Sequence, residues 1–351
     1  MTMNDYESLR MTITMNNPKT YLVTGGAGFI GSNYIHYLFS KYKNVRVINL
    51  DKLTYAGNLA NLQDLTNNPN YIFIKGDICD AEIVRNIFRE HHPDYVVNFA
   101  AESHVDRSIG KPDDFIRTDM FGVFVLLEAS KEFGIERFIQ ISTDEVYGSI
   151  LEGSFTEESP LKPGNPYSAS KAGGDRLAYS YFNTYNLPVI VTRASNNYGP
   201  YQYPEKLIPL FVTNLIENKP VPLYGDGKNV RDWLYVEDHC DAIEFILKNG
   251  KPGEVYNIAG ENELENIFIT NFIFEYMNKP KTLIKPVTDR LGHDRRYSIS
   301  AAKLHELGWQ ARHKFEDAMR TTIQWYIDNP QWWQPLKSGE YLEYYKRHYK
   351  I

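Results

Sequence analysis

Short apolar runs alternate with longer amphipathic segments along the first two hundred residues of the chain. The apolar runs predict strands at residues 21–24, 45–50, 71–75, 95–99, 138–142 and 189–193. The segments between them predict a helix that ends near residue 39 and helices at 80–89, 113–133 and 167–185. Strands that alternate with helices form βαβ units. We therefore expect an α/β fold, with a Rossmann-type, doubly wound parallel sheet covered by helices on both faces.

The alternation weakens beyond residue 196, where loops, prolines and aromatic residues increase. This shift predicts a second, smaller domain of mixed α/β structure. We expect a flexible extension at residues 1–18 and a sheet domain at 19–198 that is rejoined by about 230–260, because residues 254–258 again resemble a strand. Residues 199–229 and 261–351 then form the smaller domain, which we expect to bind the substrate.

Composition narrows the range of partners. The 351 residues include 44 acidic and 38 basic side chains, for a net charge of −6, which disfavours a nucleic-acid partner. The two cysteines, Cys79 and Cys240, show no metal-ligand spacing, so we expect no metal site and a reducing, cytoplasmic location. No apolar run approaches the roughly 20 residues of a membrane span, and we expect no membrane contact.

Three glycines follow the first predicted strand and open the first predicted helix. Gly25 and Gly28 allow a tight turn and a close approach to a pyrophosphate, while Gly31 allows close packing of helix on strand. Asp51 ends the second strand, where an acidic side chain binds ribose hydroxyls and repels the extra phosphate of NADP. The spacing predicts NAD as the cofactor.

Tyr167 and Lys171 lie four residues apart on a predicted helix, so their side chains share one face. A free tyrosine titrates near ~10, but a lysine cation and a positive nicotinamide ring both favour the phenolate. Lowering the pKa by about three units takes roughly 4 kcal/mol, which two nearby cations can supply in a partly dry site. We expect Tyr167 to act as a catalytic base.

These two motifs carry a resemblance to a known superfamily. Residues 24–31 (TGGAGFIG) and 167–171 (YSASK) resemble those of the extended short-chain dehydrogenases/reductases. That superfamily includes epimerases, decarboxylases, reductases and dehydratases, so the resemblance alone leaves the reaction open.

A pair of adjacent carboxyl groups narrows the reaction. Asp144 and Glu145 follow the fifth predicted strand, at the sheet edge where α/β proteins bind ligands. Related sugar epimerases typically have small residues at these positions. Two carboxyl groups suit an elimination, since one takes a proton from carbon while the other protonates the leaving hydroxyl.

Further segments resemble the dTDP-glucose 4,6-dehydratases. They are residues 100–108, 196–200, 231–239, 292–297 and 332–336, and the match runs from about residue 20 to 345. Residues 261–266 are less like this family, which leaves the role of Asn266 open.

The resemblance implies a set of binding residues. The cofactor would be held by Gly25, Gly28, Phe29, Ile30, Gly31, Asp51, Lys52, Leu53, Thr54, Asp77, Ile78, Ala100, Ala101, Ser103, Thr118, Tyr167, Lys171 and Asn197. Asp77 could equally be only the cap of the following helix. A nucleotide-diphosphate sugar would be held by Ser103, Thr143, Asn196, Lys206, Leu207, Pro222, Tyr224, Arg231, Asn266, Arg296 and Tyr297.

The same resemblance implies the reaction sequence. Tyr167, helped by Thr143 and Lys171, takes the proton of the 4-hydroxyl while hydride passes to NAD. Glu145 then removes the carbon 5 proton, and Asp144 protonates the departing 6-hydroxyl. Hydride returns to carbon 6, which leaves a 4-keto-6-deoxy sugar.

Alternatives remain open at this point. A nucleotide-sugar 4-epimerase needs the tyrosine and NAD but not the two carboxyl groups, and a UDP-sugar is close behind a dTDP-sugar as substrate. A non-catalytic nucleotide-binding protein on the same fold is a third possibility.

The helices at 113–133 and 167–185 carry apolar residues on two faces. These helices have more apolar residues than packing onto one side of a sheet requires, among them Leu126, Leu127, Leu177 and Tyr181. We therefore expect a homodimer in which two such helices from each subunit form a four-helix interface.

Overall fold

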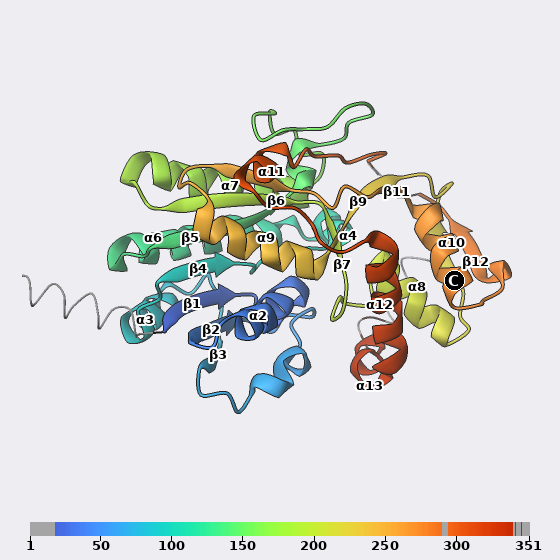
Figure 1. The fold of residues 1–351 in the computed structure, drawn as a ribbon, viewed down its shortest axis with the longest axis horizontal. Helices are drawn as coiled ribbons and strands as arrows, with labels where there is room; N and C mark the ends of the chain where they lie inside the picture. Colours follow the sequence, from blue (N-terminus) through green and yellow to red (C-terminus); the bar gives the residue numbers. More distant parts are fainter. Residues whose placement is uncertain (1–17, 290–293, 340, 342–344, 346–351) are drawn as a thin grey trace, which may run out of the picture.

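Seven parallel strands form the central sheet of the computed structural model, in the order β10-β6-β5-β4-β1-β2-β3 (Figure 1). The structure describes residues 18–289, 294–339, 341 and 345, so the predicted extension at residues 1–18 falls almost entirely outside it. The α/β Rossmann-type prediction is confirmed, and so is the return of residues 254–258 to the sheet. The strands are β1 Lys19–Thr24, β2 Val45–Asp51, β3 Tyr71–Lys75, β4 Tyr95–Asn98, β5 Arg137–Thr143, β6 Val189–Ala194 and β10 Val255–Ile258.

Helices cover both faces of this sheet, as its apolar strands require. Nearly every residue of β2 and β6 is buried, which is typical of parallel strands packed on both sides. One face carries α2 (Phe29–Lys41) and α9 (Val236–Asn249), which lie in front of the sheet in Figure 1. The other face carries α3 (Ala81–His91), α6 (Val123–Phe133) and α7 (Pro166–Tyr185).

The helix predicted at residues 113–133 is present, with a π-helical stretch in its middle. α5 (Pro112–Ile116) continues into a π-helical stretch, η2 (Arg117–Gly122), and then into α6. Gly122 packs so closely that a Cβ on it would lie 2.4 Å from Ile78 Cδ1. The same stretch places the buried carboxylate of Asp119 to accept hydrogen bonds from the Ser170 hydroxyl (2.6 Å) and the Glu102 N–H (3.0 Å). The residues of this π-helical stretch therefore contact segments that are distant in the sequence.

The residues that suggested a dimer interface pack instead within a single chain. Leu126 and Leu127 are fully buried and Tyr181 nearly so, all in the core between the sheet and its own helices. Leu177 packs against the same cluster. Other large apolar residues are exposed instead. They are Ile109 of α4 (Val105–Gly110), Ile116 of α5, Phe121 of η2, Phe124 of α6 and Tyr185 at the end of α7.

A smaller lobe is built on two short sheets beyond the carboxyl edge. β7 (Asn196–Tyr198), β9 (Val230–Tyr235) and β11 (Glu263–Glu265) form one sheet, while β8 (Val221–Tyr224) pairs with β12 (Ile284–Val287). Its helices are α8 Leu207–Ile216, α10 Asn266–Tyr276, α12 Phe315–Asp328 and α13 Pro330–Trp333. The remaining helical segments are α4 Val105–Gly110, α11 Ala302–Leu307, η1 Leu59–Leu65, η3 Asp144–Tyr147, η4 Lys281–Leu283 and η5 Pro335–Lys337.

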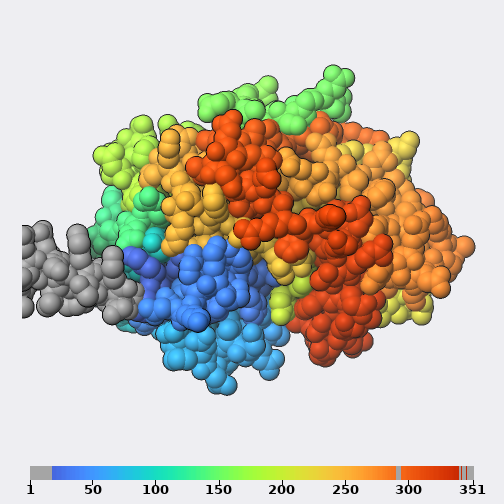
Figure 2. Space-filling model, in the orientation of Figure 1, coloured from blue at the N-terminus to red at the C-terminus, as the bar shows by residue number. Residues whose placement is uncertain are grey.

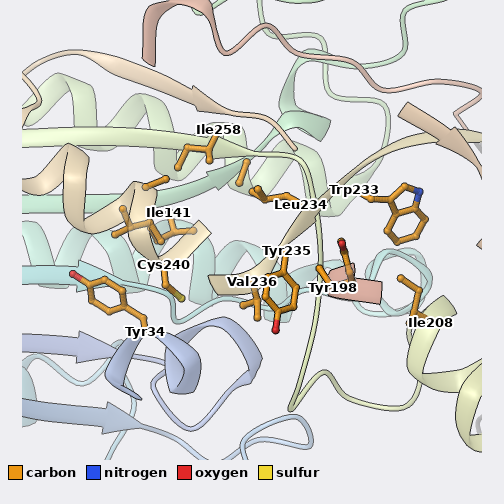
Figure 3. Packing of buried hydrophobic residues seen from close by; sticks show 14 of the residues in the cluster. Tyr34, Ile141, Tyr198, Ile208, Trp233, Leu234, Tyr235, Val236, Cys240 and Ile258 are labelled. Carbon is orange, nitrogen blue, oxygen red and sulfur yellow. The ribbon is translucent and has the colours of Figure 1, made fainter. Parts of the chain in front are cut away.

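The two lobes share one hydrophobic core. A single cluster of buried side chains continues from Tyr34 and Ile141 at the sheet to Tyr198 and Trp233 in the smaller lobe (Figure 3). The C-terminal segment, red in Figure 2, crosses both lobes, and α11 packs against β10.

The domain boundaries proposed from sequence stay a prediction. Within the part of the chain that the structure describes, no helix is long and apolar enough to cross a membrane.

Strand register brings the functional segments to one edge. Thr24 at the end of β1 pairs with Leu50 of β2 and Asn98 of β4, and Thr143 at the end of β5 pairs with Ala194 of β6. The residues that follow these strand ends therefore gather at the carboxyl edge of the sheet, beside the β1–β4 switch point where such sheets bind ligands.

Candidate active site

The first and third glycines of the motif are required by the local geometry. Gly25 has a φ of +68°, a region that side chains rarely allow, and a Cβ on it would lie 2.6 Å from the Ala100 backbone nitrogen. A Cβ on Gly31 would lie 2.4 Å from the Gly25 carbonyl oxygen. The turn after β1 and the close packing of α2 thus both exclude a side chain.

The start of α2 and the carboxylate of Asp51 contribute to the same cavity. No side chain caps α2 after Gly28, so its first N–H groups and the positive end of its dipole can bind a phosphate. The Asp51 carboxylate accepts hydrogen bonds from the N–H groups of Ala27 (2.9 Å) and Leu53 (2.7 Å). Burial raises the pKa of Asp51, while these two bonds lower it. The carboxylate is therefore oriented by the backbone before any ligand binds.

A cavity of about 320 Å³ runs along this edge and brings together most of the residues predicted for the cofactor. Leu53 lies outside its lining and contributes the N–H that orients Asp51. The predicted residues that line the cavity are Gly25, Gly28, Phe29, Ile30, Gly31, Asp51, Lys52, Thr54, Asp77, Ile78, Ala100, Ala101, Ser103, Thr118, Thr143, Asp144, Glu145, Tyr167, Lys171, Asn196, Asn197 and Lys206. One continuous space thus joins the glycine motif to the carboxyl pair.

Tyr167 and Lys171 project from the first turns of α7 into this cavity. Asn165 caps the helix through a reciprocal pair of hydrogen bonds with Ser168, which fixes where the helix begins. Lys171 is buried, and its ammonium group donates to the Ile141 carbonyl oxygen at 2.7 Å. Burial lowers the pKa of Lys171, whereas the carboxylates of Asp119 and Asp175 raise it.

The residues around Tyr167 do not by themselves lower the pKa of its phenol, so the lowering expected from Lys171 and a nicotinamide ring together stays a prediction. Burial raises this pKa well above its usual value, and the carboxyl groups of Glu145, Asp119 and Asp144 raise it further. A hydrogen bond with Thr143 acts in the opposite direction. The surrounding protein therefore disfavours the phenolate, and a cationic ligand in the cavity would be needed to stabilise it.

Asp144 is held as a neutral acid. It is 2% exposed, and its Oδ2 atom makes no hydrogen bond in the structure. Burial raises the pKa of Asp144 to about 8, with further increases from Glu145 and Asp232, against smaller decreases from Thr143 and Arg231. A carboxyl group in this state carries a proton at neutral pH and can donate it.

Glu145 lies next to Asp144 in a different environment. The 3₁₀ turn η3 begins directly after β5, and the Thr143 hydroxyl accepts a hydrogen bond from the Glu145 N–H at 3.3 Å. The Glu145 side chain is partly exposed and lines both the first cavity and its neighbour. The neighbouring carboxyl groups therefore differ in solvent access, as an acid and a base within one site should.

A second cavity of about 180 Å³ adjoins the first and reaches into the smaller lobe. Lys206 lines both cavities and donates to the Ser103 carbonyl oxygen at 2.9 Å. Arg231, which lines the second cavity, is 5% exposed. The predicted substrate residues that line this cavity are Ser103, Asn196, Lys206, Leu207, Pro222, Tyr224, Arg231 and Asn266. Cationic and apolar groups thus occur together, as a nucleotide diphosphate requires.

Two predicted substrate residues lie outside both linings. The Arg296 guanidinium pairs with the Glu263 carboxylate, with Nε 2.7 Å from Oε2, and donates to the Gly153 carbonyl oxygen at 2.8 Å. Tyr297 is buried beneath Arg231, whose guanidinium carbon lies 4.4 Å from the ring centroid. Their contribution to substrate binding stays a prediction.

Several polar residues of the site were missed from the sequence. Gln202 and Glu205 line both cavities, and their only signal was proximity to Lys206. His239 lines the first cavity, and its Nδ1 lies 2.8 Å from the Asn197 Oδ1 atom. Burial lowers the pKa of His239 to about 3, so this ring is neutral. No spacing rule connects His239 to residue 197, because the contact arises from packing α9 beside β7.

Comparison with known proteins agrees with this geometry. Residues 22–322 match the family model described as GDP-mannose 4,6 dehydratase. The chain is 49% identical over 342 residues to a dTDP-glucose 4,6-dehydratase of Xanthomonas campestris, an alignment that covers 92% of this chain and 97% of that protein. It also resembles the crystal structure of DesIV, a dTDP-glucose 4,6-dehydratase from Streptomyces venezuelae with NAD and TYD bound. The TM-score is 0.88 and the identity 48%, with 91% of this chain and 100% of that one covered.

Epimerases share the fold at a lower sequence identity. The UDP-glucose 4-epimerase of Thermus thermophilus, in complex with NAD, has a TM-score of 0.82 at 30% identity, with 88% of this chain and 99% of that one covered. The fold is therefore common to both activities, while the closer sequence match and the carboxyl pair favour dehydration. The chain belongs to the dTDP-glucose 4,6-dehydratase family within the extended short-chain dehydrogenases/reductases.

Proposed function

We propose that this protein is a hydro-lyase that converts dTDP-glucose to dTDP-4-keto-6-deoxyglucose. The observation that carries the proposal is the pair of unlike carboxyl groups in one cavity with Tyr167. Asp144 is dry and its pKa is raised to about 8, so it can give a proton. Glu145 is partly exposed beside it and can take one. An epimerase has no use for such a pair.

NAD is the cofactor that the first cavity fits. The uncapped start of α2 suits its pyrophosphate, and the buried Asp51 carboxylate suits its ribose hydroxyls while repelling the extra phosphate of NADP. Asn197, whose side chain is oriented by His239, lines the same cavity as Tyr167. Bound NAD would supply an acceptor for the carbon 4 hydride and return it to carbon 6. Its cationic ring would also favour the Tyr167 phenolate.

The protein's own groups account for the proton transfers. Tyr167 accepts the proton of the 4-hydroxyl as the ketone forms, and that ketone acidifies the hydrogen on carbon 5. Glu145 accepts the carbon 5 proton, and Asp144 gives its proton to the 6-hydroxyl, which leaves as water. Glu145 finally returns a proton to carbon 5. Asp144 starts in the protonation state that its surroundings favour. The steps leave one more proton on Tyr167 and one fewer on Asp144, and exchange with solvent restores both groups.

The second cavity fits the nucleotide part of the substrate. Arg231, Lys206 and Asn196 provide donors for a diphosphate, which carries about two negative charges and matches the planar guanidinium of Arg231. Tyr224 lies in the same lining and offers a ring on which a base can stack. We assign thymidine as the nucleoside because the relatives named above at 48% and 49% identity are dTDP-glucose 4,6-dehydratases.

Mass spectrometry of the products from a panel of nucleotide hexoses tests the activity. We expect dTDP-glucose to lose 18 mass units as water and to give a 4-keto-6-deoxy sugar. Turnover of UDP-glucose at an equal kcat/KM would reject the thymidine assignment, and an epimer of unchanged mass would reject dehydration.

The cofactor assignment has a separate test. Purified protein, denatured without added nucleotide, should release NAD, because a cofactor that is regenerated in every turnover has no need to leave. Release of NADP would contradict the role given to Asp51. Asp51→Asn should lower the amount of NAD retained, which can be measured without any turnover.

We further propose that the protein is a cytoplasmic homodimer. The exposed rings of Phe121 and Phe124 lie 5.8 Å apart on the outer side of η2 and α6, which suits an apolar contact between two copies. Phe124→Glu should therefore yield monomers in light scattering at micromolar concentration, and a monomeric mass for the unaltered protein would contradict the dimer. Two buried cysteines that are not joined to each other are compatible with a reducing compartment.

A further inference from the structure

Two charged side chains that follow neighbouring strands form an ion pair beside the first cavity. Lys52 follows β2 and Asp77 follows β3, and these strands pair in parallel, with Asp51 opposite Lys75. The Lys52 ammonium group lies 2.8 Å from the Asp77 Oδ2 atom, and both residues line the cavity. The Lys52 side chain is 56% exposed and that of Asp77 is 23% exposed. The pair therefore borders the cavity at the residue directly after Asp51.

The backbone around Lys52 holds this side chain beside the cavity. The Asp51 carboxylate accepts the Leu53 N–H at 2.7 Å, which closes a tight turn around Lys52. Leu53 has a φ of +56°, in the left-handed region that leucine rarely adopts. Such conformations persist where the surrounding structure requires them, often at ligand sites. The turn thus fixes the chain on both sides of Lys52.

The Asp77 carboxylate is held by its own segment. Its Oδ1 atom accepts the Cys79 N–H at 2.9 Å, while Oδ2 faces Lys52. The cap of α3 is Asp80, whose side chain accepts N–H groups from the first turn of that helix, so Asp77 does not serve as this cap. Burial raises the pKa of Asp77, but the hydrogen bonds with Lys52 and Cys79 bring it below its usual value. Asp77 is therefore an oriented anion that faces Lys52.

The pairing of Lys52 bears on which dinucleotide the cavity accepts. NADP carries its extra phosphate on the ribose 2′-oxygen, the group assigned to Asp51, and a lysine ammonium group commonly binds phosphate. An unpaired Lys52 would therefore offset the repulsion that Asp51 exerts. Arg117, a further cation whose charge reaches Lys52, is exposed and lies outside the cavity lining. Asp77 thus neutralises the cation that directly follows Asp51.

We propose that Asp77 is a specificity-determining residue that disfavours NADP by holding the Lys52 ammonium group in an ion pair. Asp51 repels the extra phosphate, and Asp77 removes the cation that would compensate for this repulsion. The inference rests on the proposed function, in which the first cavity binds NAD. It gives Asp77 a part in the choice between the two dinucleotides, in addition to holding the cofactor.

Asp77→Asn tests the proposal, because the amide keeps an oxygen for the Cys79 N–H but lacks the charge that holds Lys52. The purified protein is incubated with equal concentrations of isotopically labelled NAD and NADP, separated from unbound nucleotide and denatured. The released label gives the ratio of bound NADP to bound NAD. We expect this ratio to rise about tenfold over that of the unaltered protein, since the extra phosphate carries nearly two charges. Weaker retention of both nucleotides at an unchanged ratio would refute the proposal.

The double variant Lys52→Gln with Asp77→Asn separates pairing from direct repulsion. It lacks the cation that Asp77→Asn alone sets free, so its ratio of NADP to NAD should return close to that of the unaltered protein. A ratio that stays raised would show that Asp77 repels the phosphate directly, and would overturn the part given to Lys52.

Asp80→Asn provides a matched control. It removes a carboxylate three residues from Asp77, and an asparagine still caps α3. Asp80 lies outside the lining of the first cavity, so the ratio should stay as in the unaltered protein. A rise equal to that of Asp77→Asn would indicate a general effect of net charge and would overturn the role of the ion pair.

The same measurement separates this inference from the proposed function. Uptake of more NADP than NAD by the unaltered protein would refute the assignment of NAD as the cofactor. A preference for NAD in the unaltered protein, with the same ratio in Asp77→Asn, would refute only the role given to Asp77.

Discussion

The helix that carries Tyr167 and Lys171 and the turn that carries Asp144 and Glu145 lie in the same cavity but are built differently. The helix pair is set by local structure: α7 begins at a capping box, and a spacing of four places both side chains on one face. The turn pair occupies a 3₁₀ segment of four residues, Asp144–Tyr147, which has little structure of its own. Distant segments hold it in place.

Two sets of contacts with distant segments hold this turn in place. Tyr147 ends the turn, and its hydroxyl accepts from the Arg193 guanidinium (2.7 Å) and donates to the Asn257 side chain (2.8 Å). Arg193 in turn forms a buried ion pair with Asp175 of α7. Tyr297 approaches Glu145 from the other side. The comparison indicates that oxidation chemistry depends on a helix, whereas elimination chemistry depends on tertiary contacts, and the two should respond separately to mutation.

The largest effect is expected from Tyr167→Phe. The change removes the base for the first step, so neither reduced nicotinamide nor product should form. Loss of one acid–base group typically costs about 10² to 10⁴ in rate. Stopped-flow absorbance with a product assay measures both steps. Normal nicotinamide reduction in this variant would break the division between the two pairs.

Glu145→Gln should reduce product formation by a similar factor of about 10² to 10⁴ but leave oxidation intact. Tyr167 still accepts the 4-hydroxyl proton, whereas an amide cannot take the proton of carbon 5. Adding dTDP-glucose should therefore give a stable reduced-nicotinamide signal without product. Dehydration at the unaltered rate would remove the main reason for preferring a dehydratase over an epimerase.

The acid role of Asp144 predicts a dependence on pH. Burial, Glu145 and Asp232 raise the pKa of Asp144 to about 8, and only the protonated form can donate to the 6-hydroxyl. The rate of water loss, followed as a pH–rate profile, should therefore fall about tenfold per pH unit above this value. In Asp144→Asn the remaining rate should lack this alkaline decline. A decline that persists in the variant would assign it to another group.

The smallest effect is expected from Tyr147→Phe, which loosens the turn without changing its carboxyl groups. The lost hydroxyl leaves buried polar atoms of Arg193 and Asn257 with one partner fewer, which should lower the free energy of unfolding by roughly 1–3 kcal/mol. Urea denaturation measures the loss. Water loss should slow by less than about tenfold, and more than the initial oxidation does. Equal slowing of the two steps would show that the turn and the helix move as one unit.

The fold class and the helix-borne half of the site could be predicted from sequence because both depend on local pattern. Apolar runs of strand length predicted where the β-strands lie along the chain, and the glycine spacing located the turn after β1. The π-helical stretch within the helix at residues 113–133 could not be predicted in this way, since it depends on Gly122 meeting Ile78 and on Asp119 meeting Ser170 across the fold.

The sequence by itself determined the parallel sheet, the turn at Gly25, the acid at residue 51 and the facing of Tyr167 with Lys171, because each follows from periodicity or from short-range geometry. Only the tertiary structure decided the protonation of Asp144, the partners of Glu145 and the contact of His239 with Asn197. Burial and the convergence of charges from distant segments control these properties. Neither is encoded in the spacing of residues along the chain.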